Sequence, residues 1–152
     1  MDSKAFRYRL TGFIDGEGCF RIHKEKSGGY YACHFQLKLR ADDYKILEKC
    51  RDYIGAGKLK EDRDRGRSRP CIAWVIQSRS DCWILAEYLD KYSLRAKKRL
   101  EYKVWREALE YWTNMKRGNR WSGPRDWSQM ESYKSQIEKL REFQPVPAML
   151  DW

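Results

Sequence analysis

The sequence is poor in the residues that build most zinc sites. It contains two histidines, His23 and His34, and none of its five cysteines forms a C-x-x-C pair. Cysteines within apolar or strand-like segments are typical of reduced packing residues, and an odd number of them does not suit a disulfide framework. We therefore expect reduced cysteines and no zinc site. The five are Cys19, Cys33, Cys50, Cys71 and Cys82.

Long apolar runs are also missing. No segment approaches the roughly 20 apolar residues that a membrane-spanning helix needs, and residues 1–6 contain no apolar signal core. These absences predict a protein that does not bind membranes and is not secreted, located in the cytoplasm, the nucleoid or the interior of an organelle. The length of 152 residues, 41% of them hydrophobic, suits one domain with its own core.

Acidic residues are outnumbered by basic ones. The chain has 32 Lys and Arg against 22 Asp and Glu, a formal net charge of +10. This balance favours a polyanionic partner, because each phosphate that a cation neutralises releases condensed counterions. The alternative is a basic surface that binds nothing specific, so charge alone makes nucleic-acid binding only a modest favourite.

The first half of the chain has the periodicity of one helix and two β-hairpins. Phe6, Leu10 and Phe13 follow helical spacing within residues 4–14, and the glycines of residues 15–18 are expected to end that helix. Alternation then predicts paired strands whose second face is polar and basic. The expected strands are residues 19–25 and 30–39, joined by a turn at 26–29, and residues 58–64 and 70–78.

Four further helices are expected. One starts at Asp42 or Asp43, between the hairpins, and the second starts at Ser80 and Asp81. The third follows the basic segment 94–99, and the fourth covers residues 124–143, before an extended tail at 144–152. The apolar positions expected to face inward in the second and third of these are Ile84, Leu85, Tyr88, Leu89, Trp105, Ala108, Leu109 and Trp112.

The predicted order is therefore α-ββ-α-ββ-α-α-α. We expect a single α+β domain over residues 1–152, with a core at about 4–114 in which two hairpins form one four-stranded antiparallel sheet.

Residues 10–18 carry the clearest chemical signal. Carboxylates are disfavoured at a helix C-terminus, where the dipole is negative and carbonyl groups lack partners. Asp15 and Glu17 nevertheless stand there, beside glycines that expose backbone oxygens. Such a set of oxygens suits a hard divalent cation such as Mg²⁺. The alternative, which these residues alone favour, is a solvated turn that binds nothing.

Gly12 points to a second property of the same helix. Glycine within a helix costs about 1 kcal/mol relative to alanine, so it often answers a packing requirement. Tyr8, Gly12 and Asp15 share a face that is distinct from Phe6 and Leu10. A small residue on that face would let another helix approach closely, although a tolerated glycine near a helix end is the common alternative.

The nonamer Leu10-Thr11-Gly12-Phe13-Ile14-Asp15-Gly16-Glu17-Gly18 resembles the LAGLIDADG signature, and Cys19-Phe20 continues it. Further matches follow in the family's order, so residues 5–112 are similar to LAGLIDADG homing endonucleases of the single-motif type. These matches are His34-Phe35-Gln36-Leu37, Ile46-Leu47-Glu48-Lys49, Ile54-Gly55-Ala56-Gly57-Lys58-Leu59, Trp74-Val75-Ile76-Gln77-Ser78 and Leu94-Arg95-Ala96-Lys97-Lys98.

The resemblance implies an αββαββα fold whose saddle-shaped sheet lies in the DNA major groove. It implies a metal-dependent endonuclease that cuts both strands of a long, nearly palindromic DNA site, that takes no small-molecule substrate and that is associated with a mobile intron. By the same resemblance Glu17 binds the catalytic Mg²⁺ or Mn²⁺, the backbone oxygen of Gly16 is a second candidate ligand, and Lys97 supports catalysis. A single motif implies a homodimer.

The resemblance and the strand alternation together define two candidate surfaces. The dimer interface is expected at Tyr8, Thr11, Gly12 and Asp15. The DNA-binding residues are expected to be Arg21, His23, Glu25, Tyr30, His34, Gln36, Lys38, Lys58, Lys60, Arg63, Arg65, Arg67 and Arg69.

Four positions depart from the family's pattern, and one of them is Leu100, which stands where many relatives have a glutamine after the lysine pair. Thr11 stands where a small alanine is usual, Glu17 replaces aspartate, and Leu39 stands where several relatives have a glutamine near the metal. Two alternative functions share the scaffold, an RNA-splicing maturase and a DNA-binding regulator that does not cut. A metal-free structural protein is a third interpretation, and it leaves the basic sheet face unexplained.

Overall fold

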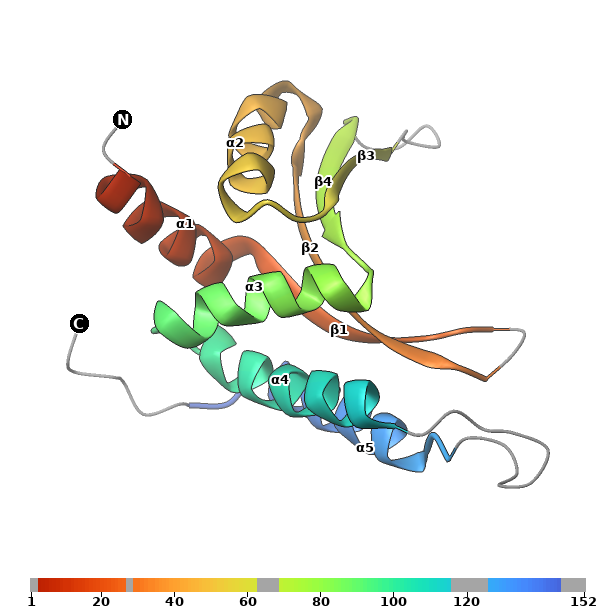
Figure 1. The fold of residues 1–152 in the computed structure, drawn as a ribbon. Coiled ribbons are helices and arrows are strands. Elements are labelled where there is room, and N and C mark those ends of the chain that lie inside the picture. Colours follow the sequence, from red (N-terminus) through yellow and green to blue (C-terminus); the bar gives the residue numbers. More distant parts are fainter. Residues whose placement is uncertain (1–2, 27–28, 63–68, 116–125, 146–152) are drawn as a thin grey trace.

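A four-stranded antiparallel sheet organises the fold (Figure 1). The computed structural model describes residues 3–26, 29–62, 69–115 and 126–145. The strand order in the sheet is β1-β2-β4-β3, so the two hairpins meet along β2 and β4. The strands are β1 (Gly18–Lys24), β2 (Tyr31–Arg40), β3 (Lys58–Asp62) and β4 (Cys71–Ile76).

Five α-helices accompany the sheet, and α1 to α4 pack against its strands (Figure 1). The last helix, α5, packs against α4 and against the edge strand β1. The predicted α+β class and element order are therefore confirmed. The helices are α1 (Ser3–Glu17), α2 (Tyr44–Ile54), which follows a 3-10 turn at Ala41–Asp43, α3 (Arg79–Lys91), α4 (Lys98–Asn114) and α5 (Ser128–Leu140).

The strand register divides the sheet into a buried face and an open face. Phe20 pairs with Phe35, which pairs with Ile76, and all three side chains are buried. The residues between them point the other way, because side chains alternate along a strand. The helices pack on one face, and among the described residues no element covers the other face.

The motif helix does not stop where we expected. The helix was predicted over residues 4–14, with residues 15–18 ending it; α1 continues through Glu17, so only Gly18 of that segment lies beyond its end. The positive φ angles among the described glycines occur at Gly29, Gly55 and Gly57. Gly18 is instead required by a close packing contact, because a Cβ there would lie 2.7 Å from the carbonyl oxygen of Ile14.

The third helix also differs from its prediction. It starts at Arg79 rather than at Ser80, because the Ser78 hydroxyl caps it by accepting a hydrogen bond of 3.2 Å from the backbone N–H of Asp81. Ile84, which was expected to face inward, is 37% exposed. Cys82 and Ala86 are buried on that face in its place, as their one-turn spacing allows.

Some predictions fall outside the described residues. They include the start of the last helix at residue 124 and most of the extended tail. Within the described ranges, no helix has the length and apolar character needed to cross a membrane.

Alanine at Gly57 should destabilise the protein more than alanine at Gly55. Their φ angles are +88° and +79°, so both substitutions strain the backbone, by about 1–3 kcal/mol. At Gly57 the added Cβ would also lie 2.7 Å from the Val75 carbonyl oxygen, whereas at Gly55 nothing lies within 4 Å. In urea unfolding, we expect Gly57→Ala to lose at least about 1 kcal/mol more free energy of unfolding than Gly55→Ala. Equal losses would refute the close approach as the reason for this glycine.

Candidate metal and DNA-binding site

The C-terminal end of α1 presents Gly16 and Glu17 to solvent. Within the described ranges, no hydrogen bond or ion pair engages the Glu17 carboxylate. The last carbonyl groups of a helix also lack helical partners and carry a partial negative charge. A carboxylate and a carbonyl together at this end favour the binding of a cation.

Asp15 ties this helix end to the segment that precedes α4. Its carboxylate accepts hydrogen bonds from the backbone N–H of Arg95 at 2.7 Å and from that of Ala96 at 3.1 Å. Glu17 lies two residues after Asp15, and Lys97 directly follows Ala96. Both candidate catalytic residues therefore lie within two residues of the hydrogen bonds that join Asp15 to Arg95 and Ala96.

Lys97 is held by a part of the chain that the sequence analysis did not connect with the site. Its Nζ donates a hydrogen bond of 2.8 Å to the backbone oxygen of Glu142, just beyond α5. Beside Glu142, the Arg141 guanidinium donates to the Glu101 carboxylate at 2.8 Å and to the carbonyl oxygen of Phe20. In the sequence these residues look like ordinary surface charges at the end of an amphipathic helix, so nothing there signals the contacts.

One face of α1 has no covering element among the described residues. Tyr8 is 66% exposed, and a Cβ added at Gly12 or Gly16 would meet no atom within 4 Å. Beside this face lies a hollow of about 490 Å³, bounded on its other side by Lys91, Tyr92, Ser93 and Arg95. The sequence analysis did not include Gly16 in the interface, although it stands one turn after Gly12.

Thr11 and Asp15, which were also expected at the dimer interface, line this hollow but make bonds within their own chain. The Thr11 hydroxyl donates to the carbonyl oxygen of Arg7 at 3.0 Å and lies 2.9 Å from the hydroxyl of Tyr88. A hydroxyl in place of the usual methyl therefore fastens α1 to α3.

The open face of the sheet carries the polar residues that alternation predicted. Gln36 pairs with Val75, which pairs with Lys58. Lys38 is aligned with Lys60 in the same way, through Ala73. In each row, a polar side chain on β2 and a lysine on β3 flank an apolar side chain on β4.

The outer part of this face is built by the first hairpin. Arg21 pairs with His34, and Arg21 is exposed. Tyr30 is 46% exposed, and the Glu25 carboxylate lies 3.5 Å from Nε2 of His23. In the connection between β3 and β4, Arg69 is exposed. Arg63, Arg65 and Arg67 lie outside the described residues.

Two histidines stack on the open face. The rings of His23 and His34 are nearly parallel, at 8°, with centroids 4.7 Å apart. Burial lowers the pKa of His34 to about 4, and His23, Arg21 and Lys60 lower it further. Nδ1 of His34 is buried without a hydrogen-bond partner in the described ranges. Near neutral pH His34 is therefore an uncharged flat ring rather than a cation.

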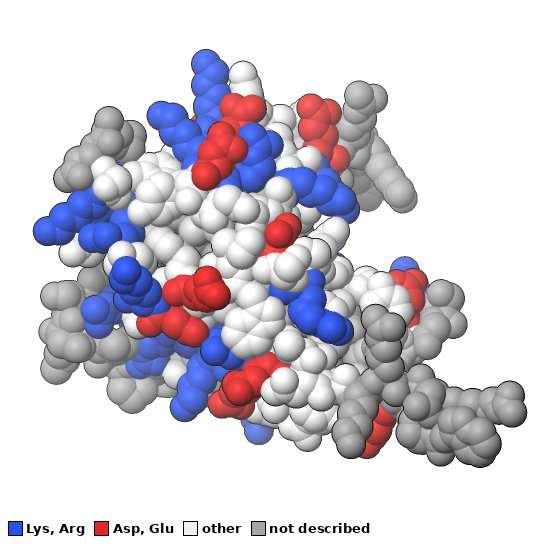
Figure 2. Space-filling model, in the orientation of Figure 1, with Lys and Arg blue, Asp and Glu red and all other residues white. Residues whose placement is uncertain are grey.

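The net positive charge is not gathered on the side shown in Figure 2, which has the orientation of Figure 1. Lys and Arg are interspersed there with Asp and Glu. Several ion pairs match this pattern, such as Arg106 with Asp90 at 3.0 Å. The open sheet face, by contrast, presents Arg21, Lys38, Lys58 and Lys60.

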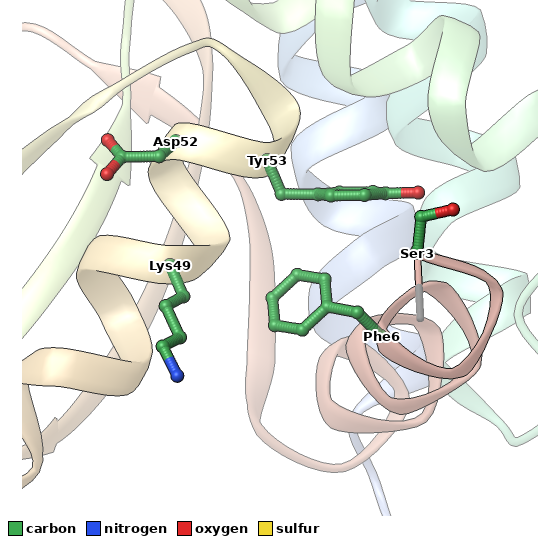
Figure 3. A pocket seen from close by; sticks show the side chains of 5 residues that line it. All are labelled: Ser3, Phe6, Lys49, Asp52 and Tyr53. Atoms are coloured by element: carbon green, nitrogen blue, oxygen red, sulfur yellow. The ribbon is translucent and has the colours of Figure 1, made fainter. Parts of the chain in front are cut away.

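A second hollow, of about 300 Å³, lies between the start of α1 and α2 (Figure 3). The rings of Phe6 and Tyr53, which line it, pack against each other at a tilt of 57° with centroids 5.0 Å apart, while Asp52 points away. Glu17 lies about 16 Å of helix further along α1. This hollow is therefore separate from the candidate site.

The donor set at Glu17 fits a metal only in part. Among the residues that the structure describes, no three His, Cys, Asp or Glu side chains come together. One chain thus offers one carboxylate and backbone carbonyl oxygen, which are the hard oxygen ligands that Mg²⁺ prefers. The other ligands would have to come from a phosphate, from water or from a second copy of this site.

The pKa of His34 predicts a specific loss of stability in acid. Unfolded His34 binds a proton near pH 6.5, whereas folded His34 binds one only near pH 4. The free energy of unfolding therefore falls as the pH drops through this window. We expect the urea midpoint to fall more between pH 7 and pH 4.5 in the wild type than in His34→Gln. The same fall in both proteins would show that His34 does not resist protonation.

Comparison with known proteins supports the predicted resemblance to LAGLIDADG endonucleases. Residues 10–109 match the LAGLIDADG endonuclease family. The chain is 34% identical to the LAGLIDADG meganuclease I-AabMI, solved bound to uncleaved DNA, with a TM-score of 0.62 over 71% of this chain and 37% of that one. The archaeal intron-encoded homing endonuclease I-Vdi141I, solved with DNA, is 16% identical but has a TM-score of 0.75 over 99% of this chain and 92% of that one.

A sequence relative from Schizosaccharomyces pombe, a probable intron-encoded endonuclease named Cox1-I1b, is 24% identical over 145 residues. That match covers 93% of this chain and 36% of the relative. The chain spans between 20% and 36% of the length of the curated relatives that it matches. With its family match over residues 10–109 and this fold, the chain belongs to the LAGLIDADG endonuclease family.

Proposed function

We propose that this protein is a site-specific endonuclease that hydrolyses phosphodiester bonds in both strands of a long, nearly palindromic DNA site. It acts as a homodimer and uses Mg²⁺ or Mn²⁺. The observation that carries this proposal is the exposed Glu17 at the end of the motif helix, joined to the Lys97 segment through Asp15. Family membership and the basic open face of the sheet support it.

The proposed chemistry divides between two side chains. Glu17 and the Gly16 carbonyl would hold the divalent ion, which when bound polarises the scissile phosphate and activates water. The Lys97 ammonium offsets the negative charge that develops on the phosphate, or orients the attacking water. Its bond to the Glu142 oxygen uses one N–H, and two N–H groups remain for these tasks.

Recognition is assigned to the open face of the sheet. A ten-residue strand such as β2 spans about 33 Å, or about 10 base pairs of DNA, so two copies would cover about 20 base pairs. Arg21 suits a guanine edge and Gln36 an adenine edge. Lys58, Lys60 and Arg69 would add base or phosphate contacts, as would the three arginines outside the described residues.

Dimerisation is assigned to the open face of α1. Tyr8, Gly12 and Gly16 lie along one side of this helix, and the two glycines would let a second helix approach. A two-fold axis at this face would bring two Glu17 side chains near each other, one for each DNA strand. Cutting both strands in one encounter requires such a pair.

Glu17→Gln should abolish cleavage and keep DNA binding. The target would first be found by incubating the wild type with a randomised DNA library in Mg²⁺ and sequencing the cut ends. On that target we expect Glu17→Gln to cut at least about 100-fold more slowly, with nearly unchanged affinity in Ca²⁺. The matched control is Glu107→Gln, which removes the same charge from an exposed position on α4.

Cleavage by Glu17→Gln at the wild-type rate would end the assignment of Glu17. Wild-type cleavage that persists in excess chelator would contradict the metal requirement. Wild-type protein that enriches one sequence from the library by binding, but cuts none of it in Mg²⁺, would leave the non-cutting regulator as the function.

Gly12→Leu should abolish dimerisation and cleavage without weakening the fold. Leucine raises helix propensity by up to about 1 kcal/mol over glycine, and Gly12 has open space around it, so the monomer should stay folded. Sedimentation with and without target DNA would measure assembly. Ser135→Leu adds the same side chain at an exposed position on α5 and should leave the dimer intact. A fully active Gly12→Leu dimer would refute this interface.

A further inference from the structure

The turn that follows α5 contacts both parts of the chain that carry the proposed catalytic residues. The guanidinium of Arg141 donates to the carbonyl oxygen of Phe20, three residues after Glu17, and lies 3.5 Å from the sulfur of Cys19. The next residue, Glu142, accepts the 2.8 Å hydrogen bond from Nζ of Lys97. A two-residue turn thus joins the start of β1 to the start of α4.

Arg141 is anchored by a buried carboxylate. Glu101 is 5% exposed, and its oxygens lie 2.8 Å from Nε of Arg141 and 3.8 Å from Nζ of Lys98. A carboxylate removed from water needs such partners. Charge-assisted hydrogen bonds to a planar guanidinium also restrict the orientation of that guanidinium. These bonds restrain the Arg141 side chain and thereby limit how far the adjoining Glu142 can move.

The rest of α5 holds the turn from the other side. Met130 and Ile137 are buried against the core, and the Tyr31 hydroxyl donates to the Glu131 carboxylate. The helix is thus fastened to β2 near its start and to β1 just after its end. The Glu142 carbonyl therefore lies just beyond a helix that is packed on the core and bonded to the sheet near both ends.

This arrangement constrains the amine without neutralising it. A lysine side chain has four rotatable carbon–carbon bonds and many rotamers, so an unrestrained ammonium would spend little time at one place. A backbone carbonyl carries no net charge, so the lysine keeps its positive charge and two N–H donors. Restraint with retained charge is what electrostatic stabilisation of a phosphate requires.

We propose that Arg141 is a positioning residue, which places the Glu142 carbonyl so that this carbonyl holds the Lys97 ammonium in its working position. The proposal rests on the proposed function in taking Lys97 as the residue that acts on the scissile phosphate. The turn after α5 is thereby part of the active-site machinery, although it is remote from the motif in sequence.

The contact itself is tested by the reactivity of lysine amines, which does not depend on cleavage. Limited acylation with acetic anhydride, read by mass spectrometry, gives the rate at Lys97 relative to exposed Lys103 on α4. We expect Arg141→Gln to raise this ratio several-fold. Lys134→Gln removes the same charge from α5, where Lys134 pairs with Glu138, and should leave the ratio unchanged. An unchanged ratio in Arg141→Gln would overturn the proposal.

The catalytic consequence is tested by single-turnover cleavage at saturating protein. Arg141→Gln should slow cleavage at least about tenfold, while its Kd for DNA in Ca²⁺ matches that of Lys134→Gln. In a Lys97→Met background, adding Arg141→Gln should change the rate less than about twofold. Equal losses in both backgrounds would mean that Arg141 does not act through Lys97, and a merely structural role would give that result.

A second variant decides the matter if Arg141→Gln does not fold. Glu142→Gly leaves the ion pair of Arg141 in place but loosens the backbone that holds the amine, whereas Glu142→Ala removes the same carboxylate without that freedom; relative to Glu142→Ala, Glu142→Gly should raise the Lys97 acylation ratio and slow cleavage. The same ratio and rate in Glu142→Gly as in Glu142→Ala would overturn the proposal. If the acylation ratios change as expected but the wild type cuts no DNA, the contact stands and the proposed function fails.

Discussion

Two hydrogen bonds to the Asp15 carboxylate hold the candidate site together. Their donors are the backbone N–H groups of Arg95 and Ala96, eighty positions away in the chain. Hydrogen bonds to a charged group contribute about 1.5–3 kcal/mol each, enough to decide how one helix end meets the next element. The contacts that α1 and α4 each make with β1 and β2 bring both helices to the same region, and these two bonds fix how the end of α1 meets the segment before α4. With them, the end of α1 and the start of α4 form one unit.

The sheet keeps its two faces chemically distinct. The buried face joins Phe20, Phe35 and Trp74 into the core, while the opposite face carries the cations and amides that meet DNA in the proposed function. Because side chains alternate, a one-residue slip in register would exchange the two faces. Gly18 and Gly57 allow close backbone approaches at the starts of β1 and β3, since a Cβ at either would lie 2.7 Å from a carbonyl oxygen.

Much of this fold could be predicted from the sequence, because strands and helices repeat with periods that local patterns display. The hairpins, the four-stranded sheet, the apolar stripe of α4 and the family were all predicted and are confirmed. Contacts between distant residues were not predictable in this way. Periodicity does not reveal that Asp15 reaches Arg95, or that Arg141 reaches Glu101. The predicted end of α1 was three residues too early, because Gly16 looked like a helix breaker.

The central claim is that the Asp15 contact places two otherwise intact catalytic residues. The direct measurement is the single-turnover cleavage rate of Asp15→Ala with saturating DNA and Mg²⁺, since Glu17 and Lys97 both remain in that protein. The account predicts a rate at least about 100-fold below the wild type, with DNA affinity retained and the fold intact. Cleavage of both strands by Asp15→Ala at the wild-type rate would contradict it.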